Sequence, residues 1–175
     1  MINNKFSIKA EARLFAIKHH GAQTYCKGYP YIVHLEDVVR VLEYFGYTED
    51  KYIASGYMHD TIEDTEVSYN DIKSKFGIEI AEIVYAVTDE LGRSRSERHE
   101  KTYPKIIANS DALIIKLADR IANIENSIRH KEEKYVKMYV AEYDEFKKIL
   151  CVDSVCDEMW RYLDNLFDEF NRFGL

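Results

Sequence analysis

Hydrophobic residues recur every three or four positions along almost the whole chain, and this spacing marks one face of an α-helix. The pattern predicts helices over about 7–20, 38–45, 53–60, 68–76, 80–87, 113–124, 135–150 and 155–170. Gly46 follows the second of these as a terminating glycine. Ser68-x-x-Asp71 has the composition of a capping box, which predicts a short helix ending at Phe76-Gly77.

The stretch from Asp89 to Glu100 loses the hydrophobic spacing and contains Gly92 and several arginines. We interpret it as a loop that enters a further helix near Ser96. We expect a kink or a helix boundary at Pro104, in or near the first turns of that helix, because a proline inside a helix costs about 3 kcal/mol.

Composition favours one all-α domain. Of the 175 residues, 46% are hydrophobic and 31% are charged, as in a globular protein. The 7 Gly and 2 Pro are too few for the repeated turns of a many-stranded sandwich or barrel. We expect a single domain over 1–175, with a motif-bearing core of about 7–150 and a closing helix of about 153–170.

The charge balance narrows the choice of partners. The chain has 24 Lys and Arg against 31 Asp and Glu, which gives a formal net charge of −7. Such a chain does not suit general binding of nucleic-acid polymers, because neutralising phosphates requires a basic surface. The net charge does not exclude a small anionic substrate, since a local group of cations or a metal is enough to bind it.

Other features predict a cytoplasmic protein. No apolar run approaches the roughly 18 residues of a membrane span, and the N-terminus has no export signal. Cys26, Cys151 and Cys156 lack the paired CxxC spacing of a zinc site, and we interpret them as reduced thiols.

The densest group of polar residues is His59-Asp60-Thr61-Ile62-Glu63-Asp64-Thr65. In a continuous helix, His59 and Glu63 would share one strip of the surface and Asp60 and Asp64 the neighbouring strip. Three carboxylates and an imidazole this close would repel one another if buried without a cation. The pattern therefore indicates either a metal site, better suited to Mn, Fe or Zn than to Ca, or a solvated acidic helix end.

A second group, Lys116, Asp119 and Asn123, lies on one face of the most apolar predicted helix. Charged groups rarely occupy such a helix unless they are paired or bind a ligand. The pattern is compatible with a structural Lys–Asp ion pair or with Asp119 as a metal ligand. In the second case, Lys116 and Asn123 would face a substrate.

In the segment from Gly28 to His34, a turn delivers His34 just ahead of the second predicted helix. Alone, this histidine would carry little weight. Together with His59, Asp60 and Asp119 it would complete a set of two imidazoles and two carboxylates, which suits one metal with room for water or substrate.

These features resemble those of the HD-domain metal phosphohydrolases, and most of all the hydrolase domain of RelA/SpoT-type enzymes and the stand-alone small alarmone hydrolases. The motifs HDxxEDT (59–65) and KLADRxxN (116–123) are specific in combination. The other matching stretches are 16–23 (AIKHHGAQ), 28–34 (GYPYIVH), 76–77, 86–90 (AVTDE) and 141–146 (AEYDEF). The resemblance implies a stand-alone, single-domain HD-type helical bundle that cleaves the 3′-pyrophosphate from guanosine bis-diphosphate, (p)ppGpp.

The resemblance also implies roles for individual residues. His34, His59, Asp60 and Asp119 match the family's metal ligands, which usually bind Mn²⁺, although other divalent transition metals are compatible with this set. Glu63 and Asp64 match the catalytic acidic pair that positions and activates water. The residues expected to contact the nucleotide substrate are Tyr25, Lys27, Lys116, Asn123 and Tyr143.

Two positions depart from the family pattern. Tyr25 and Tyr139 stand where the family tends to carry arginine, and a tyrosine can stack on a base but cannot form a charged fork to a phosphate. Lys27, Arg93, Arg95 and Arg98 are candidates to compensate. The departures keep two alternatives open: a phosphatase of NADPH or a nucleoside phosphate, and a non-catalytic nucleotide sensor.

Aromatic residues of the last helices offer a further choice. Trp160, Tyr162 and Phe167 would form either the face of a homodimer or part of the core.

Overall fold

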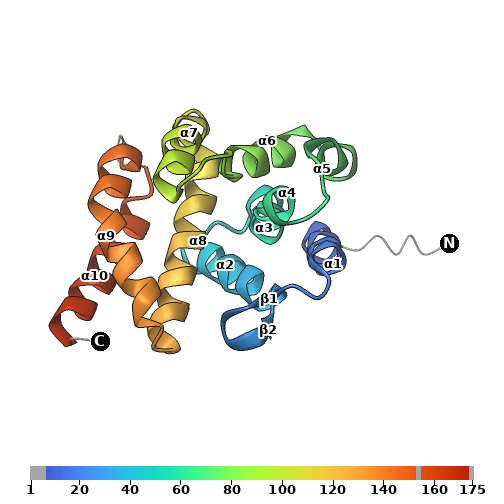
Figure 1. Cartoon of the computed structure of the whole chain (residues 1–175). Helices are drawn as coiled ribbons and strands as arrows, with labels where there is room; N and C mark the ends of the chain where they lie inside the picture. The colour runs from blue at the N-terminus through green and yellow to red at the C-terminus, as the bar shows by residue number, and fades with distance from the viewer. Residues whose placement is uncertain (1–6, 153–154, 174–175) are drawn as a thin grey trace.

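A computed structural model describes residues 7–152 and 155–173, with side chains up to residue 168 (Figure 1). The fold is all-α, as the hydrophobic spacing predicts, apart from one two-stranded sheet. The elements are α1 (Ile8–His20), β1 (Thr24–Tyr25), η1 (Cys26–Gly28), β2 (Tyr29–Pro30), α2 (Ile32–Tyr44), α3 (Asp50–Met58), α4 (Thr61–Asp64), α5 (Tyr69–Phe76), α6 (Ile78–Val87), α7 (Arg95–Ile107), α8 (Ser110–Arg129), α9 (Glu133–Leu150) and α10 (Asp157–Phe173).

The long helix α8 organises the bundle. It packs against α2, α3 and α6 on one side and against α7, α9 and α10 on the other (Figure 1). Most of its apolar residues are buried, and Leu117 and Ile121 are fully buried. A polar residue on α8 therefore lies close to several other helices, and this helix carries Asp119.

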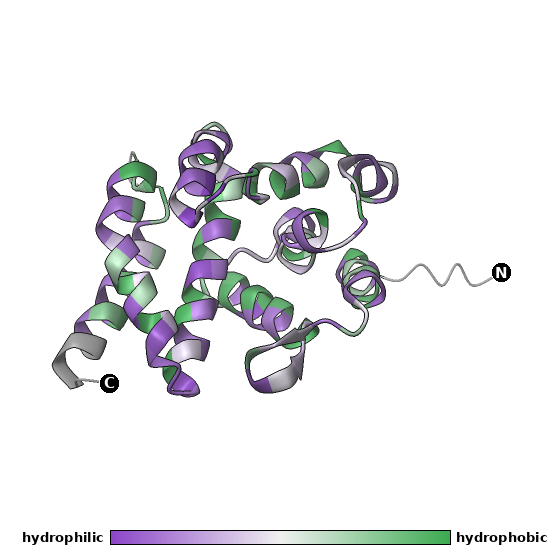
Figure 2. Ribbon diagram, in the orientation of Figure 1, coloured by the Kyte–Doolittle hydropathy of each residue, from purple (hydrophilic) through white to green (hydrophobic). Residues whose placement is uncertain are grey.

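Two hydrophobic clusters share the helices α2, α3 and α6. On α2, Val38 and Leu42 belong to the cluster around α8, whereas Leu35 and Val39 belong to the cluster shared with α1 and α5. The hydrophobic residues turn toward these two clusters and the polar residues away from them (Figure 2). Burial of both faces of α2 fixes its orientation, and with it the position of His34.

Local capping signals agree with the sequence. Ser7 caps α1, and Ser68 forms the expected capping box with Asp71 at the start of α5. Gly46, just beyond α2, has a φ of 84°, a left-handed conformation that glycine adopts without steric cost.

Three local predictions need correction. The third helix ends at Met58 rather than continuing through Asp60, and His34 lies inside the first turn of α2 rather than ahead of it. Pro104 lies in the last turns of α7, not in the first. Its missing N–H would have bonded to the carbonyl of Glu100, an exposed residue, so the helix tolerates the proline there.

The C-terminal aromatic residues are core residues. Trp160 and Phe167 are buried and Tyr162 packs against the same cluster, so this group does not supply an exposed face for a homodimer. Within residues 7–152 and 155–173, no helix combines the length and apolar composition that crossing a membrane requires.

Candidate functional site

Four side chains from three separate parts of the chain meet beside α8. His34 comes from α2, His59 and Asp60 from the junction of α3 and α4, and Asp119 from the middle of α8. The Nε2 atoms of His34 and His59 are 3.3 Å apart. The Oδ1 atom of Asp119 lies 3.3 Å from Nε2 of His34 and 3.6 Å from Nε2 of His59. The Oδ2 atom of Asp60 lies 2.9 Å from Nε2 of His59 and 3.6 Å from Nε2 of His34.

The break between α3 and α4 sets the direction of the HD pair. Because the helix stops at Met58, His59, Asp60, Glu63 and Asp64 do not lie on one continuous helical face. Asp60 turns toward the imidazoles, whereas Glu63 and Asp64 diverge from each other on the short helix α4. The sequence pattern placed these residues near one another but not in this arrangement.

His59 is oriented by the backbone of α3. Its Nδ1 atom lies 2.9 Å from the carbonyl oxygen of Gly56, so Nδ1 donates a hydrogen and leaves the Nε2 lone pair facing the cluster. Gly56 itself packs closely on α2, where a Cβ atom would come within 2.8 Å of Leu42 Cδ1 and 3.2 Å of Val39 Cγ2. The absence of a side chain thus lets α3 approach the helix that carries His34.

The electrostatics of the cluster favour a cation. Burial alone would lower the pKa of both histidines, but the carboxylates of Asp60 and Asp119 outweigh it and raise the pKa of His34 and, more strongly, of His59. Burial pushes the pKa of each carboxyl group upward, yet the imidazoles hold both well below their usual range. Positive charge is therefore favoured between these oxygens.

The donor set fits a divalent transition metal. His34, His59 and Asp119 each present one donor atom, and the three atoms lie within 4.8 Å of one another. Imidazole nitrogen together with carboxylate oxygen suits Mn, Fe or Zn, and both imidazoles are almost completely buried, so competing water is limited.

Two tyrosines from the hairpin region orient the carboxylates. The hydroxyl of Tyr31 donates to Oδ2 of Asp60 at 2.5 Å. The hydroxyl of Tyr25 donates to Oδ1 of Asn123 at 2.8 Å, and the amide of Asn123 donates to Asp119. The ring of Tyr25 also stacks on His34, with centroids 4.8 Å apart. Hydrogen bonds of this kind fix the ligands of a metal site before the metal binds.

We expect Tyr25→Phe to weaken divalent metal binding about 10-fold and at most about 100-fold, the range typical for loss of an outer hydrogen bond. The substitution keeps the ring on His34 and removes only the hydroxyl that holds Asn123. Competition with a metal-sensitive dye measures the affinity. Tyr29→Phe in the same hairpin is the control, because Tyr29 is an exposed residue of β2. Equal affinities for the Tyr25 variant and the wild type would show that Asn123 is held without Tyr25.

Glu63 is the member of the acidic pair that faces the cluster. Its Oε2 atom accepts a hydrogen bond from the backbone N–H of Asp89 at 3.1 Å, and its Oε1 atom lies 3.7 Å from Arg98. Burial, with the negative charges of Asp89 and Asp60, raises the pKa of Glu63 and makes it a better proton acceptor. Asp64 instead accepts a hydrogen bond from the Gln23 amide at 2.9 Å.

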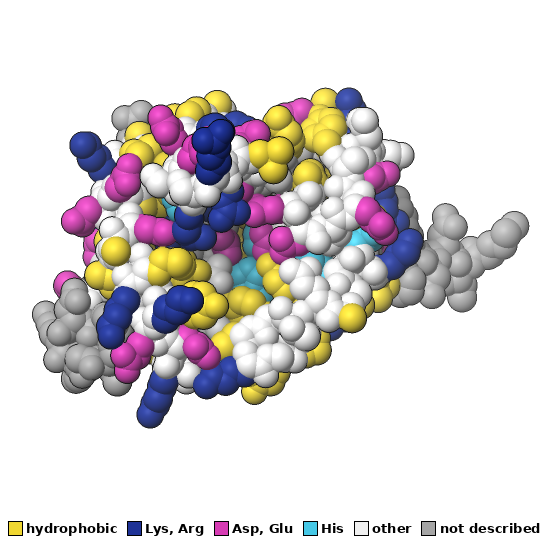
Figure 3. Space-filling view, viewed as in Figure 1, with side chains coloured by type: hydrophobic (Ala, Val, Ile, Leu, Met, Phe, Trp, Pro, Cys, Tyr) yellow, Lys and Arg dark blue, Asp and Glu magenta, His cyan; other side chains and the backbone are white. Residues whose placement is uncertain are grey.

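A small polar cavity of about 140 Å³ opens directly on the cluster. Figure 3 shows histidine surface at the floor of a central hollow that acidic and basic side chains border. Lys116 lies between two carboxylates, with Nζ 3.9 Å from Asp89 and 4.0 Å from Asp119. The residues lining the cavity are Tyr25, Tyr31, His34, Asp60, Glu63, Asp89, Arg95, His99, Lys116, Asp119, Arg120, Asn123 and Tyr139.

A second, larger cavity of about 410 Å³ adjoins the first, and Tyr25, Asn123 and Tyr139 line both. Its other lining residues are Thr24, Cys26, Asn126, Ser127, Glu132 and Tyr135. Three aromatic rings with amide and hydroxyl groups between them suit a ring system that also makes hydrogen bonds.

The expected substrate contacts divide into two groups. Tyr25, Lys116 and Asn123 line the cavities. Lys27 and Tyr143 lie outside the lining of both cavities. Lys27 is exposed on η1, with Nζ 3.7 Å from Glu132, and the hydroxyl of Tyr143 donates to Asp164 of α10 at 2.8 Å. Packing of α10 against this part of α9 accounts for the direction of Tyr143.

Several residues at the site were not singled out from the sequence. Tyr31, Asp89, His99 and Arg120 all line the small cavity. Arg120 could have been found, since it is a charged residue in the most apolar helix, as Lys116 and Asp119 are. Tyr31 and Asp89 lie in the matching stretches 28–34 and 86–90, but nothing in the spacing marked either one as a site residue, and His99 gave no signal. Only the packing of the hairpin and of α6 and α7 against α8 brings these three residues to the cavity.

The chain is similar to several known proteins. A model of the HD domain family matches residues 12–144. The guanosine-3′,5′-bis(diphosphate) 3′-pyrophosphohydrolase MESH1 of Danio rerio is 32% identical over 136 residues, which cover 75% of this chain and 76% of that protein. An Aquifex aeolicus enzyme of the same name is 35% identical over 129 residues, 71% of this chain, but the match spans only 18% of the Aquifex protein.

The fold has a close counterpart among solved structures. A metazoan ortholog of SpoT that hydrolyses ppGpp and plays a role in starvation responses superposes with a TM-score of 0.79. The match covers 95% of this chain and 97% of the ortholog at 21% identity. A family match over more than half of the chain and a relative of similar length lead to the same conclusion: the chain belongs to the HD domain family.

Proposed function

We propose that the protein is a metal-dependent phosphohydrolase that removes the 3′-pyrophosphate of guanosine bis-diphosphate. The observation that carries this proposal is the meeting of His34, His59, Asp60 and Asp119 beside a cavity that also contains Glu63. The Danio and Aquifex relatives carry the name of this activity.

The four clustered side chains would hold the metal, and manganese suits their nitrogen and oxygen donors. When bound, such a cation polarises a phosphate oxygen and lowers the pKa of water. The hydroxyl of Tyr31 and the amide of Asn123 keep the two carboxylates in place. Lys116 lies between Asp89 and Asp119, where its charge would balance part of the negative charge of these two carboxylates.

Glu63 would act as the general base. Its carboxylate takes a proton from a water molecule, and the water oxygen forms a bond to the phosphorus attached to the ribose 3′ oxygen. The bond between that phosphorus and the ribose oxygen breaks, and the oxygen takes up a proton as the pyrophosphate leaves. The backbone N–H of Asp89 fixes the orientation of the Glu63 carboxylate.

The larger cavity would hold the nucleoside. The rings of Tyr25, Tyr135 and Tyr139 provide surfaces on which a base can stack, and Asn126 and Ser127 provide hydrogen-bonding groups. Because Tyr25, Asn123 and Tyr139 border both cavities, a nucleotide can reach from the base site to the metal cluster. We further propose a cytoplasmic enzyme that acts on this small nucleotide and not on nucleic-acid polymers.

A second candidate function has one observation in its favour. Tyr25 and Tyr139 line the cavity where the family tends to carry arginine, so the wall shared by both cavities has fewer positive charges than the resemblance implies. A nucleotide with a phosphate monoester, such as NADPH, would need fewer positive charges at this wall.

Substrate profiling separates the two functions. The Mn²⁺-loaded protein is incubated with (p)ppGpp, NADPH and nucleoside monophosphates, and products are resolved by ion-exchange chromatography. We expect pyrophosphate and guanosine 5′-di- or triphosphate from (p)ppGpp, no turnover after EDTA treatment and recovery on addition of Mn²⁺. Release of orthophosphate from NADPH alone would favour the second function, and saturable binding without turnover would indicate a sensor.

A further inference from the structure

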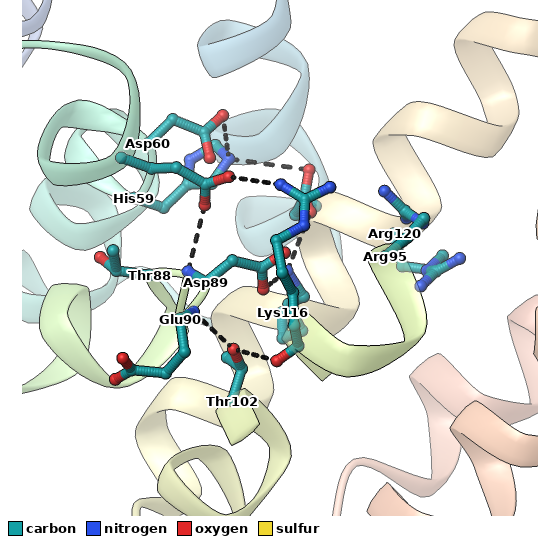
Figure 4. A network of polar contacts seen from close by, with 12 residues as sticks. His59, Asp60, Thr88, Asp89, Glu90, Arg95, Thr102, Lys116 and Arg120 are labelled. Carbon is teal, nitrogen blue, oxygen red and sulfur yellow. Dashed lines mark hydrogen bonds and ion pairs between the residues drawn. The ribbon is translucent and has the colours of Figure 1, made fainter. Parts of the chain in front are cut away.

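Two arginines form one wall of the small cavity. Arg95 is the first residue of α7, and Arg120 follows Asp119 on α8. Both line the same cavity of about 140 Å³ as the metal-ligand candidates His34, Asp60 and Asp119. In Figure 4, Asp89 and Lys116 lie between the His59–Asp60 pair and these two arginines.

Arg120 is held rigidly. Its side chain is only 3% exposed, and its guanidinium lies between the rings of Tyr139 and Phe146, 4.7 and 4.4 Å from their centroids. Its Nη1 atom donates to Oε2 of Glu142 at 3.1 Å. A buried charge with one hydrogen-bonded partner and two stacked rings cannot move without a large energetic cost.

Glu142 also anchors Arg95. Its Oε1 atom accepts a hydrogen bond from Nε of Arg95 at 2.6 Å, so a single carboxylate contacts both guanidinium groups. Although burial pushes the pKa of Glu142 upward, the two arginines hold it below its usual value. Within the described residues, the group of Arg95, Arg120 and Glu142 therefore carries a net charge of +1.

The neighbouring residues agree with a positive field at this wall. His99 lines the same cavity, and burial together with the charge of Arg95 lowers its pKa to about 4. Lys116, which also lines the cavity, lies near the carboxylates of Asp89 and Asp119. Arg98, outside the lining, lies near Glu63. The excess of positive charge is thus located at Arg95 and Arg120.

We infer that Arg95 and Arg120, anchored by Glu142, form a subsite for the distal phosphate of a pyrophosphate group whose proximal phosphate lies at the metal cluster. The inference rests on the proposed function and extends it, because it names the residues that would select a pyrophosphate ester over a phosphate monoester. A monoester offers no second phosphate to this wall. A guanidinium provides several N–H donors in a planar fork, which suits phosphate oxygens.

The test uses inorganic anions as well as nucleotides. Isothermal titration of the Mn²⁺-loaded protein with pyrophosphate and with orthophosphate gives the binding preference. We expect the wild type to prefer pyrophosphate, and Arg95→Gln to reduce that preference about tenfold or more while binding of orthophosphate stays within about twofold. Because the Arg95 side chain is partly exposed, at 37%, the variant should fold.

Lys101→Gln is the matched control. It removes one positive charge from the same helix, and Lys101 donates its hydrogen bonds to Glu97 and the carbonyl of Leu91 and does not line the cavity. The subsite would be overturned if Arg95→Gln weakened the binding of pyrophosphate and orthophosphate equally, or weakened neither. It would also be overturned if the wild type did not prefer pyrophosphate. A wild type that prefers pyrophosphate but does not hydrolyse (p)ppGpp would overturn the proposed function and keep the subsite. Hydrolysis of (p)ppGpp with unchanged kinetics in Arg95→Gln would overturn the subsite and keep the proposed function.

Discussion

Asp119→Ala is expected to lose divalent metal and to reduce turnover by at least about 10³-fold, since metal catalysis contributes several kcal/mol to the barrier. Asp119 is the only one of the four clustered side chains that comes from α8, and its Oδ1 atom lies within 3.6 Å of Nε2 of both histidines. Alanine removes this oxygen and leaves two imidazoles beside Asp60 alone. Metal content by atomic absorption and pyrophosphate release, measured on the same preparation, test both effects.

Asp111→Ala is the matched control, because it makes the same change on the same helix, where Asp111 pairs with Lys51 instead. Thermal unfolding separates loss of metal from loss of fold. Addition of Mn²⁺ at 100 times its Kd should stabilise the wild type and the Asp111 variant by about 2.7 kcal/mol and the Asp119 variant by much less. An Asp119→Ala protein that keeps metal and full activity would contradict the assignment of the cluster.

Glu63→Gln is expected to keep the metal and to lose about 10²- to 10⁴-fold in kcat, the range for removal of a general base. Glutamine retains the shape of the side chain and can still accept the hydrogen bond from Asp89, but it cannot take a proton from water. Metal content and pre-steady-state release of pyrophosphate are the measurements. Glu66→Gln, at an exposed position three residues later, is the control.

Comparison with Asp64→Asn separates the members of the acidic pair. Asp64 is bound to Gln23 and does not line the small cavity, so we expect Asp64→Asn to cost less than Glu63→Gln. The reverse order would identify Asp64 as the base. Loss of metal in Glu63→Gln would instead place Glu63 among the ligands.

The sequence predicted best what depends on local spacing. The capping box at Ser68 follows from its residue types, and the shared face of Lys116, Asp119 and Asn123 follows from the period of a single helix; both are present. The all-α class followed from the same period. The order of His34, His59, Asp60 and Asp119 along the chain suggested one metal site but left structural roles open for the separate groups. The resemblance then implied that these four residues are the metal ligands.

What could not be predicted depends on tertiary packing. The end of α3 at Met58 separates His59 from the short helix α4 that carries Glu63 and Asp64, and no residue in the HD segment is a helix breaker. Glu142 joins Arg95 and Arg120 from positions 47 and 22 residues away, and only the packing of α7, α8 and α9 brings them together. Tyr143 points to α10 because tertiary packing places its hydroxyl next to Asp164.

The hairpin between α1 and α2 has a consequence for how such an enzyme can change. It presents Tyr25 to both cavities, yet its residues from Thr24 to Pro30 are exposed or partly exposed, and they belong to neither hydrophobic cluster. Substitutions in this segment can therefore alter ligand preference while the helices that support the chemistry keep their packing. Selectivity in this scaffold can diverge at little cost to folding stability.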